Sequence, residues 1–453
     1  MKKAELVPTY QNVFESFQQD AIGRNTDLLY FVKLLNSVSG AYSIALDGRW
    51  GSGKTFFVLQ TKMIFEAFNE FTQMKNNITE DDREAIKTSW VLLQRKEKED
   101  DFEPSLNVCV YYDAWEHDTE EDPVTSLIYE ISKTAASGYE FKSERDYLSI
   151  ATTIIDLISG RDHKALLEAL KAPNITDSVK EQQGVREKIN EYFDKLLPEH
   201  GEKLIIFVDE LDRCNPCYAV KLLERIKHYF TNDKITFVFS VNMDQLQHTI
   251  KQHYGKDFNA HKYIDRFFDF VLPIPQVDMG RFCQSMGEDL SLTVKEVAHA
   301  TIKQYNMEMR EVAKYFDTLR VATQKHDSYL YDAPAKNFCF YIMLPIAIGL
   351  HKHDISLYDA FTQGGDATPL EDIMMREEMA ELLESYFFKN TEDIDLYDEE
   401  AKRNRIKEAY SALFETGANG LKRITIGKIP FESSAYKYFT KVIRMLNKTA
   451  SFE

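Results

Sequence analysis

A glycine-rich segment at residues 48–55, with the sequence GRWGSGKT, has the residue types and the spacing of a phosphate-binding loop. It matches G-x-x-x-x-G-K-[ST] at every fixed position, between an apolar run and a helical pattern. Glycines let successive backbone N–H groups face phosphate oxygens, and the following helix directs its positive N-terminus at them. The Lys54 ammonium suits the β- and γ-phosphates, and the Thr55 hydroxyl suits Mg²⁺. We expect a Walker A loop that binds ATP or GTP with Mg²⁺; the alternative is an ordinary glycine-rich turn.

A second segment predicts where the catalytic base lies. The run KLIIFVDE at 203–210 is an apolar strand pattern that ends in two carboxylates, as in a Walker B motif. Asp209 is expected to hold Mg²⁺ through water, and Glu210 is expected to polarise the attacking water. The alternative is a pair of solvated acids at a strand end. Together the two segments predict hydrolysis of a nucleoside triphosphate.

Two later polar positions are weaker candidates for the same site. Asn242 follows the strand pattern ITFVFSV and could orient the attacking water or sense the γ-phosphate. The alternative for Asn242 is a residue that only starts a loop. Arg266 could reach the γ-phosphate of a neighbouring subunit as an arginine finger. Its alternative is a salt bridge with Asp265 or Asp269.

These residues require a scaffold that brings distant segments to one edge. Apolar runs with little alternation are typical of strands buried on both faces of a parallel sheet. Helical patterns separate the runs, which predicts an α/β fold: a P-loop NTPase sheet of about five parallel strands with helices on both faces. The predicted strands are residues 43–46, 108–112, 204–208, 235–241 and 267–272.

The pattern along the chain predicts three parts. Residues 1–275 form the nucleotide-binding core, with a helical insertion around 138–200; residues 276–330 form a helical lid; and residues 331–453 form a helical C-terminal region. A basic tail begins at Lys402. This tail could contact nucleic acid, but we favour basic helical faces that pack against acidic residues.

The amino-acid composition limits which partners the protein can bind and which cellular compartment it fits. The formal net charge of -18 disfavours wholesale coating of DNA or RNA, so a nucleic-acid partner is possible but not indicated. Five cysteines do not suggest a disulfide framework and fit a reducing cytosol. The apolar run at 338–350 is too short to span a bilayer, and the first residues lack the apolar stretch of a signal peptide. We therefore expect a cytoplasmic protein without a membrane partner.

Four segments carry a distinctive set of residues: DGRWGSGKT at 47–55 with its unusual tryptophan, VYYDAWE at 110–116, VDELDRC at 208–214 and YIDRFF at 263–268. Together they resemble the motifs of the KAP family of P-loop NTPases, which is related to the STAND and AAA+ proteins. The likeness spans about residues 20–275. The sequence departs from the family pattern at Asp113, where the family has Asn, and at Arg266, where the family has Lys.

The resemblance also gives meaning to two arginines. Arg24 lies in a segment, residues 20–24, where related ATPases contact adenine. Arg310 lies where they carry a sensor-2 lid, and could contact the γ-phosphate; for both, a surface arginine is the alternative. The predicted catalytic residues are Glu210, Lys54 and Arg266, and the predicted metal ligands are Thr55 and Asp209. The predicted nucleotide-binding residues are Gly48, Trp50, Gly51, Ser52, Gly53, Lys54, Thr55, Phe56, Arg24, Asn242 and Arg310.

The resemblance finally implies a cellular role. Many KAP proteins carry transmembrane helices between the Walker motifs, whereas this insertion resembles that of the soluble bacterial branch, whose members are often implicated in defence against phage. We expect a Mg²⁺-dependent ATPase whose nucleotide state switches a helical region and that works with a protein partner or effector encoded nearby. A finger role of Arg266 would require a homo-oligomer, because such an arginine acts across an interface. The rivals are a nucleotide-gated scaffold with little hydrolysis and a small-molecule kinase, for which no acceptor motif is visible.

Overall fold

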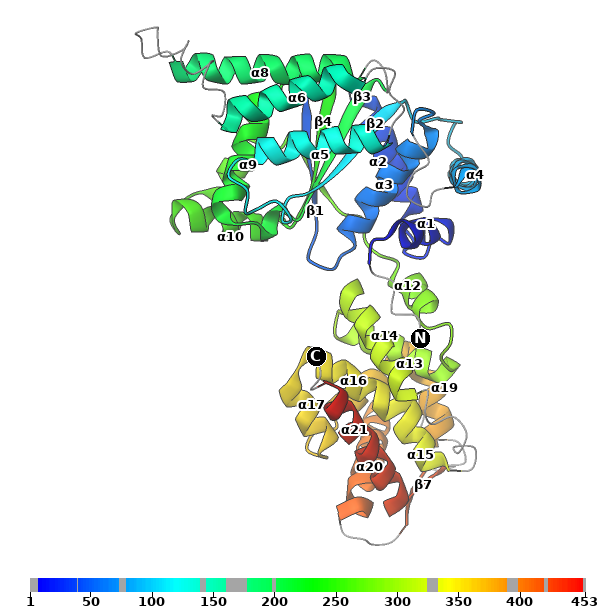
Figure 1. The fold of residues 1–453 in the computed structure, drawn as a ribbon. Helices are drawn as coiled ribbons and strands as arrows, with labels where there is room; N and C mark the ends of the chain where they lie inside the picture. The colour runs from blue at the N-terminus through cyan, green and yellow to red at the C-terminus, as the bar shows by residue number, and fades with distance from the viewer. Residues whose placement is uncertain are drawn as a thin grey trace. The chain divides into compact units, whose positions relative to one another are not determined.

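The computed structural model consists of two compact units, Val7–Asp278 and a unit that holds Met279–Glu453. Each unit has a hydrophobic core of its own. In Figure 1 the first runs from blue to green and the second from green to red. The structure describes residues 7–38, 40–72, 79–138, 144–159, 177–197, 201–323, 333–388, 398–418 and 423–450.

A five-stranded parallel sheet forms the centre of the first unit, which confirms the predicted fold class. The strand order is β2-β3-β4-β1-β5, so β4 separates the strand before the Walker A loop from the strand of the Walker B motif. All four neighbouring pairs are parallel, and all carboxyl ends therefore meet at one edge. The strands are β1 (Tyr42–Asp47), β2 (Asn107–Asp113), β3 (Lys203–Asp209), β4 (Ile235–Val241) and β5 (Phe270–Pro273).

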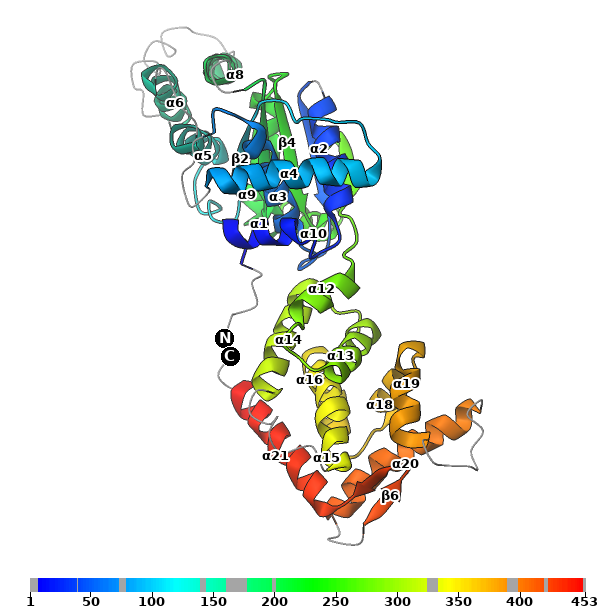
Figure 2. The ribbon, with the colours of Figure 1, turned by 90° about the vertical axis from the view of Figure 1, so that its right-hand side faces the viewer.

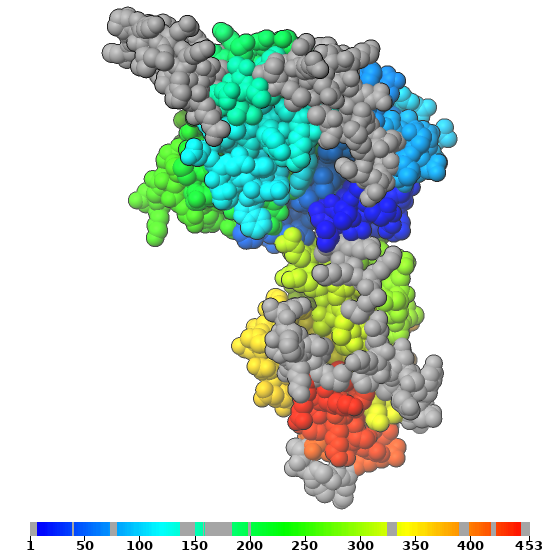
Figure 3. Space-filling view, viewed as in Figure 1, coloured from blue at the N-terminus to red at the C-terminus, as the bar shows by residue number. Residues whose placement is uncertain are grey.

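Helices cover both faces of this sheet. On one face α3 packs against β2 and β4, and α1, α2 and α4 pack against α3, with α4 running across the outside in Figure 2. On the other face α5, α9 and α10 share a core with the strands, and α5 covers the sheet in the space-filling view of Figure 3. Of the insertion helices, α6 packs against α5, and α8 packs against α6 and α9. The helices are α1 (Tyr10–Gln18), α2 (Asn25–Ser37), α3 (Lys54–Phe68), α4 (Glu80–Glu97), α5 (Pro123–Gly138), α6 (Glu144–Ser159), α8 (Asp177–Leu196), α9 (Pro216–Tyr229) and α10 (Met243–Tyr254).

The last strand, β5, differs from the expectation of strands buried on both faces. It starts at Phe270 rather than at 267, because Phe267 still belongs to the turn after α11 (Ala260–Ile264), where its N–H donates to the Ile264 carbonyl at 2.8 Å. Phe270 and Val271 are 43% and 49% exposed. The physical reason is helix cover: the other edge strand, β2, is buried between α3 and α5, whereas among the described elements only β1 packs extensively against β5.

The second unit is mainly helical, and its core includes the long apolar run. The turn Cys339–Met343 is π-helical and leads into α16 (Leu344–His353), where Pro345 has no N–H for the helical ladder. Every residue of the run is buried except Tyr341, which is partly buried. No helix in the described parts of the chain combines the length and the apolar character that a membrane crossing needs.

Helices from the predicted lid and from the predicted C-terminal region belong to this one unit. Helices α13 (Leu292–Gln304) and α14 (Met309–Thr323) pack against α16. An antiparallel hairpin of β6 (Ile424–Ile426) and β7 (Ile429–Phe431) lies near α20 (Glu399–Ala418) and α21 (Ser433–Ala450), and the sequence did not reveal it.

Part of the basic tail serves packing within this unit. Arg403 and Lys407, one turn apart on α20, contact the Glu371 carboxylate at 2.7 and 3.1 Å. Glu371 lies on α18 (Thr368–Met374) and is buried. A buried carboxylate needs such partners, and Arg403 and Lys407 supply them.

Candidate nucleotide-binding site

The loop between β1 and α3 has a backbone that only glycine adopts easily. Gly51 and Gly53 have φ angles of 83° and 84°. A Cβ on Gly48 would lie 2.5 Å from the Ile274 side chain and 2.8 Å from Ser52 Oγ. The Ser52 hydroxyl itself is buried and has no hydrogen-bond partner in the described structure. A phosphate oxygen would satisfy it, so the loop fits the group for which its sequence is typical.

Lys54, the first residue of α3, is buried against this loop. Its ammonium donates hydrogen bonds to the carbonyls of Gly48 (2.7 Å) and Arg49 (3.2 Å). Burial lowers the pKa of Lys54, while the carboxylates of Asp212 and Asp209 act in the opposite direction. The ammonium is thus held inside the loop by neutral carbonyls, and a phosphate would supply the negative charge that these carbonyls lack.

Thr55 and Asp209, the two predicted metal ligands, are in direct contact. Thr55 Oγ1 donates to Asp209 Oδ2 at 2.7 Å, and the Tyr111 hydroxyl donates to the same oxygen at 3.0 Å. The other carboxylate oxygen accepts the Glu210 N–H at 3.0 Å. A hydroxyl and a carboxylate are the hard oxygen donors that Mg²⁺ prefers, so these residues fit the ion. No group of three or more His, Cys, Asp or Glu side chains in the described residues could hold a metal, so phosphates and water would complete its shell.

Glu210 has the features of a residue held under constraint for function. Its φ of 59° is in the left-handed region, which few non-glycine residues adopt and which functional sites often contain. Its Oε2 lies 2.5 Å from Arg213 Nε. Burial and then the nearby Asp209 carboxylate raise the pKa of Glu210 to about 7, although Arg213 lowers it. A carboxyl group that titrates near neutral pH is suited to accept a proton from water.

This pKa has a consequence for stability without nucleotide or metal. The folded protein binds the Glu210 proton more tightly than the unfolded chain does. Protonated Glu210 therefore contributes fully to the free energy of unfolding below about pH 4.5, and this contribution is lost as pH rises through about 7. We expect Glu210→Gln to raise Tm by roughly 3 °C at pH 8 in EDTA, with a smaller difference at pH 5. This Tm should be taken from the melting transition that shifts when nucleotide is added, because that transition reports on the unit that contains Glu210.

The matched control is Glu408→Gln, which breaks an exposed ion pair with Arg405 in the other unit. Surface pairs of this kind contribute little to stability, so its Tm should match the wild type at both pH values. A Glu210→Gln protein that melts below the wild type at pH 8 would show that the Glu210 carboxylate stabilises the folded state instead.

Arg24 lies beside the loop although it precedes β1 in the chain. Its Nη1 donates to the Ser52 carbonyl at 2.9 Å, and the side chain is buried. Gly23, with a φ of 70°, turns the chain just before it, and α2 begins at the next residue. Arg24 is therefore not a surface arginine: it braces the P-loop backbone. A contact between residues 20–24 and adenine stays a prediction.

Asn242 also lies at this edge, and its side chain has a local partner. Its Oδ1 accepts the N–H of Gln245 at 3.2 Å, so it caps the N-terminus of α10. The preceding Val241 carbonyl accepts the N–H of Gly48 at 3.0 Å, which places Asn242 next to the start of the loop. Asn242 therefore starts a helix rather than a loop, and an orienting contact with water or the γ-phosphate remains a prediction.

The structure does not bring Arg266 to the P-loop of the same chain. Arg266 is exposed and precedes β5, and the neighbouring Asp269 accepts the N–H of Ser43 at the beginning of β1. The loop follows the other end of β1, roughly 16 Å away at the usual rise per strand residue. Arg266 makes no ion pair with Asp265 or Asp269 in the described structure. Arg310 is exposed on α14 in the second unit.

Three further residues, Tyr111, Trp115 and Arg213, belong to the site and were not among the predicted site residues. Tyr111, on β2, holds Asp209 as described. The Arg213 guanidinium lies 5.8 Å from the ring centroids of both Trp50 and Trp115. Arg213 could have been identified from the sequence, because it follows Glu210 by three positions in VDELDR. This spacing places both side chains on one side of a helical turn.

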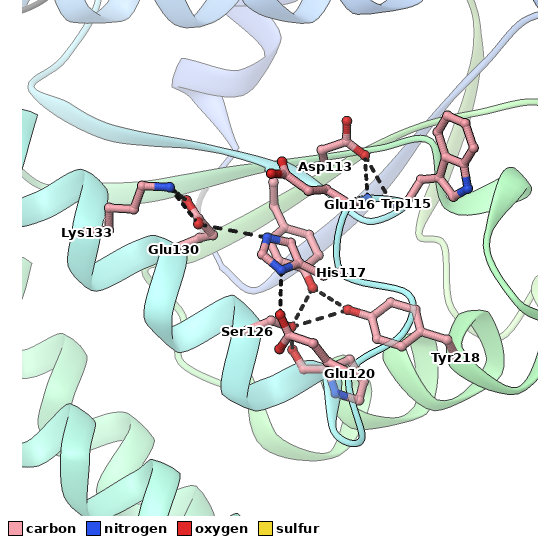
Figure 4. A network of polar contacts seen from close by, with 11 residues as sticks. Asp113, Trp115, Glu116, His117, Glu120, Ser126, Glu130, Lys133 and Tyr218 are labelled. Atoms are coloured by element: carbon pink, nitrogen blue, oxygen red, sulfur yellow. Dashed lines mark hydrogen bonds and ion pairs between the residues drawn. The ribbon is translucent and has the colours of Figure 1, made fainter.

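The segment after β2 is held by the polar network in Figure 4. Asp113 Oδ1 accepts the N–H groups of Trp115 (3.0 Å) and Glu116 (3.2 Å). His117 contacts Glu120 at 2.8 Å and Glu130 at 3.8 Å. The Asp that replaces the family's Asn thus orders the turn that carries Trp115. Burial, more than the neighbouring Asp209, raises the pKa of Asp113.

Comparison with known proteins identifies the family of this chain. The family model described as KAP family P-loop domain matches residues 28–325, more than half of the chain. No curated protein matches the sequence. Among solved structures, one described as "Structure of the Aeropyrum Pernix ORC2 protein (ADPNP-ADP complexes)" is similar at 12% identity and a TM-score of 0.33, over 86% of this chain and 95% of that one. A TM-score this low carries no argument about this chain. The family match does: the chain belongs to the KAP family of nucleotide-binding P-loop NTPases.

Proposed function

We propose that this protein is a cytoplasmic, Mg²⁺-dependent ATPase that acts as a nucleotide-controlled switch in anti-phage defence, together with a protein partner encoded nearby. The observation that carries the enzymatic part is the 2.7 Å contact between Thr55 and Asp209, beside Glu210. It joins the Walker A helix to the Walker B strand through the two side chains suited to Mg²⁺. The family resemblance supports the choice of ATP over GTP and the role in defence.

Each residue of the site has a defined task in hydrolysis. Lys54 and the loop N–H groups bind the phosphates, and Thr55 and Asp209 would hold Mg²⁺, which would neutralise charge on the phosphate oxygens. Glu210 orients water and accepts its proton as the water oxygen bonds to the γ-phosphorus. The bond from that phosphorus to the β–γ bridging oxygen breaks, which releases the nucleoside diphosphate and inorganic phosphate.

The enzymatic proposal is tested by phosphate release from the full chain. We expect turnover with MgATP to exceed that with MgGTP and to stop in EDTA. Turnover that persists in EDTA would overturn the metal requirement, and faster GTP turnover would overturn the nucleotide assignment. Tight binding of ATP with negligible turnover, even with the partner present, would favour the nucleotide-gated scaffold.

The cellular proposal needs a separate test. Bacteria that carry the gene with its chromosomal neighbours should form fewer phage plaques than bacteria that carry the Lys54→Ala gene in the same context. Equal protection by both genes would rule out a nucleotide-controlled role in defence. Equal sensitivity of both to every phage tested would count against the defence role itself.

We further propose that Arg266 acts on the nucleotide of a neighbouring copy. Its exposed side chain lies at the end of the sheet opposite its own P-loop, and its carbonyl accepts a hydrogen bond from Lys227, which holds the backbone in place. We expect Arg266→Ala to lower turnover at least about tenfold, given the effects of arginine fingers elsewhere. Mixing Arg266→Ala with Glu210→Gln protein should restore part of the activity, because a shared site can then combine an intact Glu210 with an intact Arg266.

The control for this experiment is Lys262→Ala, which removes an exposed cation from the same surface. It should leave turnover close to the wild type and should not affect the mixing result. If the two inactive proteins give no activity after mixing, while light scattering shows that they assemble, Arg266 does not complete a neighbour's site.

A further inference from the structure

Two tryptophans and an arginine from three separate segments meet beside Glu210. Trp50 comes from the P-loop, Trp115 from the turn after β2, and Arg213 from the short 3₁₀ helix Leu211–Arg213 after β3. The guanidinium lies 5.8 Å from both ring centroids, within the range of a cation–π contact. The tryptophans are 46% and 53% exposed, so they are not there to fill the core.

Each tryptophan is anchored to the nucleotide unit by an aspartate. Trp50 Nε1 donates to Asp212 Oδ2 at 2.5 Å, and the Asp212 carbonyl accepts the Thr249 hydroxyl at 3.1 Å. The N–H of Trp115 donates to Asp113, and its indole makes none of the polar contacts drawn in Figure 4. The Trp50 ring is therefore held by its indole N–H, whereas Trp115 is held by its backbone N–H, and the rings of both contact the Arg213 guanidinium.

Arg213 in turn holds the Glu210 carboxylate. The 2.5 Å contact joins side chains that are 24% and 19% exposed, where an ion pair is screened less than at the surface. The backbone N–H of Arg213 also donates to the backbone carbonyl of Glu210 at 3.0 Å, so the same turn holds the backbones of both residues. Neighbouring Asp209 has other partners, Thr55 and Tyr111.

We propose that Arg213 is a positioning residue that orients the Glu210 carboxylate for catalysis, and that Trp50 and Trp115 in turn orient Arg213. A general base must be placed within a fraction of an ångström of its productive position, and a glutamate side chain has three rotatable bonds to restrain. This inference rests on the proposed function, in which Glu210 is the base. The proposal also explains why Trp50 and Trp115 lie exposed beside the site: their rings restrain the Arg213 guanidinium.

The test is a double-mutant cycle on MgATP turnover with the full chain. We expect Arg213→Gln to lower kcat about 10- to 100-fold and to change KM by less than about threefold, because the base is misplaced while the phosphate contacts stay. In a Glu210→Gln background the same change should lower kcat by less than about twofold, because there is no carboxylate left to orient.

The tryptophan arm uses Trp115, which lies outside the P-loop. Trp115→Ala should lower kcat about fivefold, whereas Trp115→Phe, which keeps an aromatic face, should stay within about twofold of the wild type. Arg213→Lys keeps the charge but not the planar fork, so its kcat should fall between those of the wild type and Arg213→Gln. If Arg213→Gln fails to fold, the kcat values of the Trp115 variants and of Arg213→Lys test whether Arg213 positions Glu210.

The control is Arg225→Gln, which breaks a similar arrangement: Arg225 contacts Asp122 at 3.2 Å and lies 5.3 Å from the Tyr229 ring. Its kcat should match the wild type. Equal losses from Arg213→Gln in both backgrounds, or a loss confined to KM, would overturn the proposal and point to a direct phosphate contact. Wild-type turnover of Glu210→Gln would instead refute the assigned base, whatever Arg213 does.

Discussion

Replacing Glu210 with glutamine should lower kcat about 100-fold or more, while nucleotide affinity stays within about threefold of the wild type. Glutamine keeps the size of the side chain and can still accept a hydrogen bond from Arg213, but it cannot accept a proton from water. The binding groups Lys54 and Thr55 do not contact the Glu210 side chain in the structure. Phosphate release gives kcat, and equilibrium binding of a fluorescent ATP analogue gives the affinity.

Glu116→Gln is the matched control for this prediction. Glu116 is an exposed glutamate in the turn after β2, close in space to Asp113, and it has no ion-pair partner in the described structure. The same chemical change there should leave kcat unchanged. If Glu210→Gln turns over MgATP at the wild-type rate, water is activated by another group and the left-handed conformation of Glu210 needs a different explanation.

Replacing Lys54 with alanine should weaken the binding of MgATP more than about 100-fold. The substitution removes a charge-assisted contact to the phosphates, and it leaves the carbonyls of Gly48 and Arg49 facing them without a cation between. The simplest measurement is the shift of Tm on adding MgATP, since a ligand stabilises only the folded state that binds it. The wild type should show a clear shift at 1 mM MgATP, and the variant should show none.

Lys62→Ala controls for loss of a lysine from the same helix. Lys62 lies two turns after Lys54 on α3 and contacts Glu66 at 2.5 Å, away from the loop. Its nucleotide-induced shift should equal that of the wild type. A Lys54→Ala protein that keeps the full shift would show that the Gly48–Thr55 loop does not bind the phosphates as its sequence indicates.

The sheet and the Walker residues could be predicted because their signals are local. Five apolar runs correspond to the five strands, and parallel strands place their carboxyl ends at one edge whatever their order. Thr55 and Asp209 therefore had to lie at the same edge, although 154 positions separate them in the chain. Their direct contact adds the distance, which spacing alone does not give.

The remaining features depend on tertiary neighbours that a single sequence does not specify. Tyr111 is read from the sequence as a strand residue, and only the register of β2 with β3 brings its hydroxyl to Asp209. The cluster of Trp50, Trp115 and Arg213 requires three turns to converge. The exposure of β5 follows from which strands the helices cover, because a covered strand such as β2 and an uncovered strand of similar composition look alike in the sequence.

The hydrogen bond from Arg24 to the Ser52 carbonyl bears on where the functional unit starts. The family match begins at residue 28, four positions after this arginine. A fragment cut at that boundary would keep every Walker residue and would lose a buried guanidinium that supports the loop from outside. Recombinant versions of the nucleotide unit should therefore begin upstream of α1, so that the brace and the loop are expressed together.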